Sequence, residues 1–330
     1  MILITGGFGQ LGKLLKIELL HKGYKPSDII LTSRKEEICT YNCIVETGDL
    51  QNIDFLRLVL TKYPVSKVFN FGTSSFVDRS LVLEDYLNFT RCKIFDNLIQ
   101  IISEKNNDIW VCHPLSSEIF GIPSTDYQGL ETKISPINSY GLQKSIEIVK
   151  CRFLLEQGFN IFFPVLFNIE SIYRKEKFFT RRIIEGLIHY EHCHDLTITF
   201  YNAYSTRDFS YGPDIIKLFV YAMNKALTGD ECFGSNSSLT VINFIEGVLN
   251  ELKIKYELAH EEGLIKIIDT NGNIIAQEKD RSKLDEGRKF KFNGIFRHSE
   301  YQNFQIRGGK ELIKKLTKDY VQYKNIRRTF

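Results

Sequence analysis

The stretch MILITGGFGQLGKLL, residues 1–15, carries the strongest structural signal in the sequence. An apolar strand pattern runs directly into Gly6, Gly9 and Gly12 and then into a helical pattern. Small residues at such a point let a pyrophosphate approach the backbone N–H groups at the start of a helix. A glycine triplet alone is a weak signal, but the strand-turn-helix context is the one that a dinucleotide requires. We therefore favour a dinucleotide-binding turn over a merely tight turn.

The first half of the chain alternates short apolar runs with amphipathic helical patterns. The runs ILIT, DIILTS, KVFNFG and IWVCHP are separated by stretches such as LGKLLKIELLHKG and IDFLRLVLTKY. This alternation predicts βαβ units and a parallel sheet. We expect an α/β fold, a Rossmann-like doubly wound parallel sheet with a smaller C-terminal α/β substrate lobe. The expected boundaries are 1–168 plus a returning segment at 196–224 for the first domain, and 169–195 with 225–330 for the lobe.

Three further elements follow from local patterns. A helical pattern covers residues 139–157, and NIFFPVLFN, residues 160–168, is expected to form one buried strand. The segment IKIIDTNGNIIAQ is typical of a hairpin that turns at Asn271 and Gly272. The apolar residues expected on one side of the helix are Ile146, Val149, Phe153 and Leu154.

Composition limits the classes of function. The 330 residues carry a net charge of only +3, so no global field indicates nucleic acid or an acidic membrane surface as a partner. Seven cysteines without paired spacing indicate reduced thiols and a cytoplasmic protein. The sequence shows no export signal and no apolar run of about 18 residues that would span a membrane. The cluster HYEHCHD mixes helix faces, so we expect a surface cluster and no metal site.

The second expected strand, IILTS, ends where a bound adenosine ribose would lie. Ser33, Arg34 and Lys35 follow there in place of an acidic residue. A hydroxyl beside an Arg suits a 2′-phosphate, so NADP is preferred to NAD. The less favoured alternative is that Arg34 and Lys35 form a solvated turn. Asp49 is expected to accept a hydrogen bond from the adenine amine. The predicted cofactor set is Gly6, Phe8, Gly9, Gln10, Leu11, Gly12, Ser33, Arg34, Asp49, Leu50, Phe71 and Gly72, with Tyr140 and Lys144.

Tyr140 and Lys144 lie four residues apart in the predicted helix, hence on one face. The Lys144 ammonium is expected to lower the pKa of the phenol towards neutrality, which would make the phenol a usable base. The pair alone occurs often by chance. Combined with the glycine turn and with the hydroxyl of Ser116 at a strand end, it resembles the extended short-chain dehydrogenase/reductase superfamily.

The segment SSEIFG, residues 116–121, is similar to the Thr-Ser-Glu-Leu-Tyr-Gly signature of GDP-mannose 4,6-dehydratases. Ser116 stands at the Thr position and Glu118 at the Glu position. The resemblance implies that Tyr140 is the base for oxidation at C4 of a hexose, tuned by Lys144, while Ser116 holds O4. Glu118 would remove the C5 proton as water leaves from C6. Reductases of related nucleotide sugars can also carry a Glu at this position.

Three later segments extend the resemblance to the dehydratases. They are VLFNIESIYRKEKFFTRRI, YNAYSTRDFSYGPDII and FRHSEY. Arginines are expected at the diphosphate because their planar fork donates two hydrogen bonds at once. Departures from the pattern at Ser74, Phe76, Thr206 and His298 leave the sugar open. The substrate-binding residues implied by the resemblance are Ser75, Asn168, Glu170, Thr180, Arg181, Asn202, Arg207, Arg297 and Glu300.

These patterns predict an NADP-dependent nucleotide-sugar 4,6-dehydratase that converts a GDP-hexose to its 4-keto-6-deoxy product in a bacterial or viral surface-sugar pathway. GDP-mannose and a variant such as GDP-N-acetylglucosamine are the expected GDP-sugar substrates. A C4 epimerase or 4-keto reductase of the same fold is the main alternative, and an inactive cofactor-binding regulator is another. Helices near 85–103 and 139–157 are those with which relatives form dimers, so a homodimer or homotetramer is expected.

Overall fold

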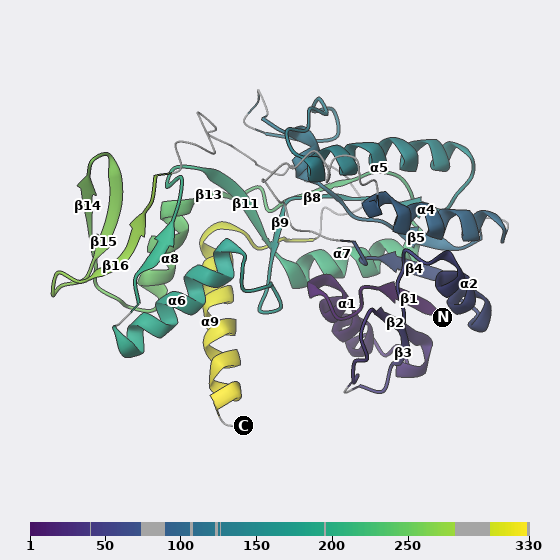
Figure 1. Cartoon of the computed structure of the whole chain (residues 1–330), viewed down its shortest axis with the longest axis horizontal. Helices are drawn as coiled ribbons and strands as arrows, with labels where there is room; N and C mark the ends of the chain where they lie inside the picture. The colour runs from purple at the N-terminus through teal and green to yellow at the C-terminus, as the bar shows by residue number, and fades with distance from the viewer. Residues whose placement is uncertain are drawn as a thin grey trace.

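A six-stranded parallel sheet forms one end of the molecule (Figure 1). The computed structural model describes residues 1–39, 41–73, 90–105, 108–122, 125, 127–194, 196–280 and 304–328. The strand order β3-β2-β1-β4-β5-β7 reverses direction between β1 and β4, and ligands of such sheets bind at the carboxyl ends of the strands beside this switch. The predicted doubly wound α/β fold is therefore confirmed. The strands are β1 (Ile2–Thr5), β2 (Ile29–Ser33), β3 (Ile44–Thr47), β4 (Lys67–Asn70), β5 (Trp110–Cys112) and β7 (Ile161–Phe162).

Helices cover both faces of this sheet. Successive side chains of a strand point to opposite faces, so Ile2 and Ile4 of β1 pack with α1 and α7, whereas Leu3 packs with α2, α4 and α5. Burying one such aliphatic side chain stabilises the fold by about 1.5–3 kcal/mol. The helices are α1 (Gln10–His21), α7 (Gly212–Lys225), α2 (Ile53–Lys62), α4 (Thr90–Ser103) and α5 (Ser139–Glu156).

The predicted helix over 139–157 is confirmed as α5, but its apolar side faces outward. Val149 is 62% exposed and Phe153 is 59% exposed. The opposite side of the helix buries Glu147 and Cys151 against the sheet layer. The inner face of α5 therefore carries the polar residues of interest, and the outer face is free for another contact.

The expectation of one continuous strand over 160–168 is wrong. The segment forms β7, β8 (Val165–Leu166) and β9 (Asn168–Glu170), which belong to three different sheets. Pro164 lacks the N–H group of a ladder residue, and its carbonyl instead accepts a hydrogen bond from Leu115 N at 2.8 Å. The partners of β8 and β9 in the two small sheets are β6 (Leu115–Ser116), β12 (Cys232–Phe233), β11 (Thr206–Tyr211) and β13 (Ser238–Thr240).

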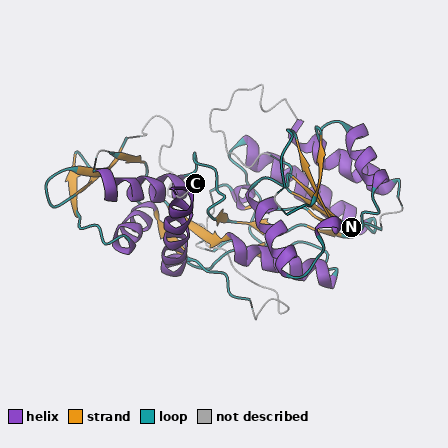
Figure 2. Cartoon of the chain, turned by 90° about the horizontal axis from the view of Figure 1, so that it is seen from below, coloured by secondary structure: helices purple, strands orange, loops and turns teal. Residues whose placement is uncertain are grey.

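A second group of elements lies at the other end of the molecule (Figures 1 and 2). The predicted hairpin is confirmed, because β15 and β16 pair antiparallel and Asp269 accepts hydrogen bonds from Asn271 N and Asn273 N in the turn. Each helix in the described part of the chain is too short or too polar to cross a membrane. The elements of this end are β10 (Ile198–Phe200), β14 (Glu257–Glu261), β15 (Leu264–Ile268), β16 (Ile274–Glu278), α6 (Phe179–Cys193), α8 (Val241–Glu251) and α9 (Gly309–Arg328).

Candidate active site

The glycine turn after β1 has the geometry of a dinucleotide cradle. Gly6 has a φ of +64°, and a Cβ there would lie 2.7 Å from the Phe71 carbonyl oxygen. A Cβ on Gly12 would lie 2.6 Å from the Gly6 oxygen, so close packing of the turn on α1 requires this glycine as well. Gly9 is exposed, and its Cβ would meet only the Gly6 oxygen at 3.2 Å. The helix has no side-chain cap, so its first N–H groups can receive an anion.

Gln10 connects this turn to the substrate side of the molecule. Its amide donates to Ile169 O at 3.0 Å and to Ser171 Oγ at 3.1 Å, and its oxygen accepts from Arg174 at 3.2 Å. Phe8 and Leu11 are half-buried beside it. Gln10, a predicted cofactor-binding residue, therefore also links β9 to the glycine turn.

The predicted adenosine end lies at the end of β2. Ser33 Oγ accepts a hydrogen bond from Lys35 N at 3.2 Å, and the Arg34 side chain is exposed. Asp49 is exposed and accepts from Gln51 N at 3.0 Å. Leu50 is buried against Gly72, where an added Cβ would lie 2.3 Å from the leucine Cδ1. These residues line the same carboxyl edge of the sheet as the glycine turn.

The structure brings the four predicted catalytic residues together. Ser116 ends β6, and its hydroxyl lowers the pKa of the Tyr140 phenol. Glu118 follows within a 3₁₀ turn, Ser117–Phe120, and its charge acts on the same phenol. Lys144 is one turn further along α5 and is only 2% exposed. The Glu118 side chain is partly buried in this site rather than projecting into solvent.

Asn138 orients Glu118, a role that sequence reasoning missed. Its Nδ2 donates to Glu118 Oε2 at 2.7 Å, while its Oδ1 accepts from Gly141 N at 2.7 Å and caps α5. A Cβ on Gly141 would lie 2.4 Å from the Glu118 carbonyl, so the two segments pack closely. A polar residue directly before a predicted helix is typical of an N-cap, and this was the available signal.

Lys144 lowers the pKa of the Tyr140 phenol as predicted, but the net shift is upward, so the pKa does not approach neutrality. Burial raises the pKa of the phenol, and Lys144 and Ser116 oppose this effect without cancelling it. The charge of Lys144 is also paired, with Nζ lying 2.6 Å from Glu147 Oε2. The carboxylate of Glu147 itself raises the pKa of the phenol.

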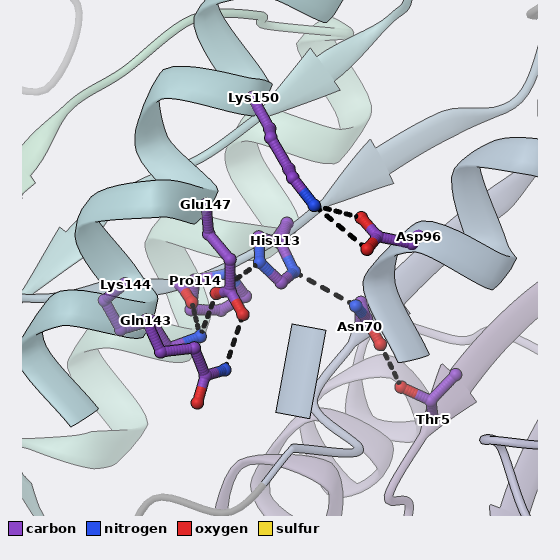
Figure 3. Close-up of polar contacts among 9 residues, drawn as sticks. All are labelled: Thr5, Asn70, Asp96, His113, Pro114, Gln143, Lys144, Glu147 and Lys150. Carbon is purple, nitrogen blue, oxygen red and sulfur yellow. Dashed lines mark hydrogen bonds and ion pairs between the residues drawn. The ribbon is translucent and has the colours of Figure 1, made fainter. Parts of the chain in front are cut away.

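Glu147 lies at the centre of a buried cluster that the sequence analysis did not single out (Figure 3). Its Oε2 accepts from Lys144, and its Oε1 accepts from Gln143 Nε2 at 2.6 Å. Lys144 also donates to the Pro114 carbonyl at 3.2 Å. Burial alone would raise the pKa of Glu147, but Lys144 and His113 outweigh it and hold the pKa below its usual range. The i,i+3 spacing of Lys144 and Glu147 in a predicted helix could have indicated the pair.

The cluster continues through the ends of three strands (Figure 3). His113 Nε2 lies 2.9 Å from Glu147 Oε2, and its Nδ1 lies 3.0 Å from Asn70 Nδ2. Because an amide nitrogen can only donate, Nδ1 is the acceptor and Nε2 carries the proton that Glu147 accepts. Asn70 Oδ1 accepts from Thr5 Oγ1 at 2.8 Å, which in turn accepts from Gly72 N at 3.0 Å. Burial lowers the pKa of His113 and keeps the ring neutral.

The predicted substrate residues divide into two groups. Glu170 and Thr180 are buried and hydrogen-bonded to each other, and Arg174 forms an ion pair with Glu170 at 3.5 Å. Burial raises the pKa of Glu170 despite this pair. Arg181 binds Glu185 at 2.9 Å and the Arg174 carbonyl at 2.6 Å. These contacts hold the start of α6 against β9, so this group has a supporting role in the structure around the site.

The other group lies around β9 and β11. Asn168 begins β9 and pairs in register with Phe209, while Asn202 lies in the connection that precedes β11. Arg207 is half-buried and donates to the Thr206 carbonyl at 2.8 Å. Ser74, Ser75, Phe76, Arg297, His298 and Glu300 lie outside the described residues.

No group of three or more His, Cys, Asp or Glu side chains within the described ranges could hold a metal ion. The described site instead offers a glycine turn with an uncapped helix start, a hydroxyl, a phenol, an ammonium and a carboxylate. Such a set can bind a dinucleotide and can transfer protons at two neighbouring positions of a bound ligand.

Comparison with known proteins places these features in one family. The GDP-mannose 4,6 dehydratase family model matches residues 3–289. A GDP-mannose 4,6-dehydratase from Vibrio cholerae is 24% identical over 297 residues, covering 85% of this chain and 78% of that protein. One from Sordaria araneosa is 23% identical over 268 residues, covering 78% of this chain but only 49% of that protein.

A solved structure shows the shared fold. The dTDP-glucose 4,6-dehydratase from Bacillus anthracis, in complex with NAD, superposes with a TM-score of 0.74 at 15% identity. The superposition covers 98% of this chain and 97% of that one. With the family model matching most of its length, the chain belongs to the GDP-mannose 4,6-dehydratase family.

Proposed function

We propose that this protein is a nucleotide-sugar 4,6-dehydratase that acts on a GDP-hexose with NADP. The observation that carries the proposal is the partly buried Glu118 carboxylate, held by Asn138 beside Ser116, Tyr140 and Lys144. With a nicotinamide as the hydride acceptor, a hydroxyl, a phenol and an ammonium are enough to oxidise a sugar carbinol. A carboxylate aimed at the same ring adds the ability to eliminate water.

The residues divide the reaction between them. The glycine turn and Lys144 would hold a nicotinamide cofactor, which would supply reversible hydride transfer between C4 and C6 of the hexose. Tyr140 takes the proton of the C4 hydroxyl while Ser116 holds that oxygen, and the ketone that results makes the C5 proton acidic. Glu118 removes the C5 proton and delivers a proton to the C6 hydroxyl, which leaves as water. Once the hydride has reached C6, a proton returns to C5, so the products are a 4-keto-6-deoxy sugar and one water.

The nucleotide is proposed to be GDP, because the relatives named above are GDP-mannose 4,6-dehydratases. Arg207 and Asn168 are proposed to contact the diphosphate or the sugar from the edges of β11 and β9. Asn202, together with Ser75, Arg297 and Glu300 of the undescribed segments, completes the proposed contacts by resemblance. Free thiols at all seven cysteines support a reducing, cytoplasmic setting.

Replacing Glu118 tests the elimination step. We expect Glu118→Gln to slow the loss of water from GDP-mannose by about 10²–10⁴-fold while oxidation at C4 continues, because the amide cannot accept the C5 proton. Rapid-quench mass spectrometry of the sugar follows water loss, and the absorbance of reduced nicotinamide follows oxidation. Tyr140→Phe should abolish both signals.

The matched control is Glu156→Gln, which removes an exposed carboxylate from the end of α5. This variant should behave as the wild type. Undiminished water loss in Glu118→Gln would contradict the role proposed for this carboxylate, and net consumption of NADPH by the wild type would show a 4-keto reductase instead.

The preference for NADP is proposed from Arg34. Arg34→Ala should weaken NADP⁺ binding by roughly tenfold to a hundredfold, because a charged hydrogen bond contributes about 1.5–3 kcal/mol, and should leave NAD⁺ binding unchanged. Isothermal titration with both cofactors measures the difference. The exposed neighbour serves as the control, since Lys35→Ala should change neither affinity. Equal loss in the two variants, or none in either, would indicate a solvated turn and NAD as the cofactor.

We also propose a homodimer, or a tetramer built from it, through α4 and α5. An apolar groove between these helices is lined by side chains that include Phe95, Ile99 and Phe153. The exposed Val149 and Phe153 would be covered by a second copy. Phe153→Glu should therefore shift the protein towards monomer in light-scattering chromatography. Leu58→Glu alters an equally exposed side chain on α2 and should not; a wild-type assembly in both variants would contradict this interface.

A further inference from the structure

The Lys144 ammonium is buried under conditions that would normally remove its charge. The side chain is 3% exposed, and an unpaired lysine at such a site tends to lose its proton. Glu147, whose side chain is 0% exposed, lies 2.6 Å from it on the same helix. An ammonium has three donors, and Glu147 Oε2 and the Pro114 carbonyl accept two of them. One donor is left for a ligand in the site.

Glu147 is held from both sides. Gln143 binds one carboxylate oxygen, and His113 and Lys144 bind the other. The His113 ring is itself fixed, because it stacks on Phe95 with centroids 4.1 Å apart and rings inclined by 19°. The carboxylate therefore has little freedom to turn, and it holds the ammonium of Lys144 in one position.

We propose that Glu147, fixed by His113, is a positioning residue that keeps Lys144 protonated and directs its remaining donor towards the cofactor and Tyr140. The inference rests on the proposed function for its catalytic consequence. The effect on Lys144 itself, namely its charge and the direction of its third N–H donor, does not depend on which reaction this site catalyses. The phenol and the ammonium are thus both controlled by one carboxylate that touches neither substrate nor cofactor.

The other groups that face Glu147 leave this carboxylate as the main buried negative charge near Lys144. Burial raises the pKa of the thiols of Cys92 and Cys151 and keeps them neutral, and His113 is neutral for the same reason. Asp96 is paired with Lys150 at 2.7 Å near the surface. The groups around the carboxylate are Tyr140, Lys144 and Cys151 on α5, Cys92 and Asp96 on α4, and His113 after β5.

Removing the charge of Glu147 has a defined effect on the rate profile. The carboxylate raises the pKa of both Lys144 and Tyr140, so its neutralisation lowers both values. Activity requires a phenol that can release its proton and an ammonium that has kept its own. Both limbs of the profile of kcat against pH therefore move to lower pH. The lysine limb moves by at least about one pH unit, the shift that two charges 2.6 Å apart give even at the dielectric constant of water.

The experiment compares Glu147→Gln with the wild type. The pH dependence of kcat with GDP-mannose and the affinity for NADP⁺ at each pH are measured, after urea unfolding has shown that the variant folds. We expect both limbs to shift to lower pH and NADP⁺ binding to weaken as Lys144 loses its proton. Arg152→Gln, which breaks a surface ion pair of the same helix with Asp230, should leave both profiles in place. A folded Glu147→Gln with unshifted limbs and unchanged NADP⁺ affinity would overturn the proposal.

A second variant keeps the inference testable if Glu147→Gln does not fold. Glu147→Asp retains the charge but is one methylene shorter, so Lys144 must follow it away from the site. We expect kcat and NADP⁺ affinity to fall by about tenfold with the limbs in place, and wild-type values in this variant would contradict the positioning role. If no GDP-sugar is turned over, the proposed function fails, yet the NADP⁺ affinities across pH still decide the inference about Glu147.

Discussion

The ion pair between Lys144 and Glu147 joins the chemistry of the site to the framework of the sheet. Hydrogen bonds lead from this pair through His113 and Asn70 to Thr5, so the ends of β1, β4 and β5 and the inner face of α5 form one polar unit. Removing one partner would leave an uncompensated buried charge, which is strongly destabilising. The distance between sheet and helix, and hence the position of the phenol over the cofactor edge, depends on this unit remaining complete.

A second connection ties the cofactor turn to the far end of the molecule. Gln10 reaches from the glycine turn to Ile169 and Ser171, and the Tyr320 hydroxyl of α9 donates to the Ser171 carbonyl at 3.0 Å. The substrate side is therefore anchored at the start of α1, where the pyrophosphate of a dinucleotide would lie. Binding of cofactor and of sugar nucleotide would act on neighbouring parts of the same framework. This arrangement suits a reaction in which one hydride leaves the sugar and returns to it.

The sequence predicts those parts of the fold that depend on local periodicity and on glycine. The alternating runs, the helix over 139–157 and the Asn271–Gly272 turn follow from patterns within a few residues. Pro164 broke a predicted strand because strand continuity depends on backbone donors, which an apolar pattern does not report. The net pKa shift of Tyr140 was misjudged because the spacing of Tyr140 and Lys144 reports neither the burial of the phenol, which raises its pKa most, nor the Glu147 carboxylate that the fold places against Lys144. Contacts between distant segments, such as His113 with Glu147, are set by topology and leave little trace in a single sequence.

A crystal structure of the protein with NADP⁺ and a GDP-hexose would show whether Lys144 and Glu118 act as proposed. We expect Lys144 Nζ to remain in contact with Glu147 while its third donor reaches a ribose hydroxyl of the cofactor. We also expect the Glu118 carboxylate and the Tyr140 phenol to lie against adjacent carbons of the same hexose ring. A lysine that has turned away from Glu147 would rule out the positioning role of Glu147, and a Glu118 carboxylate directed away from the sugar would rule out its role in eliminating water.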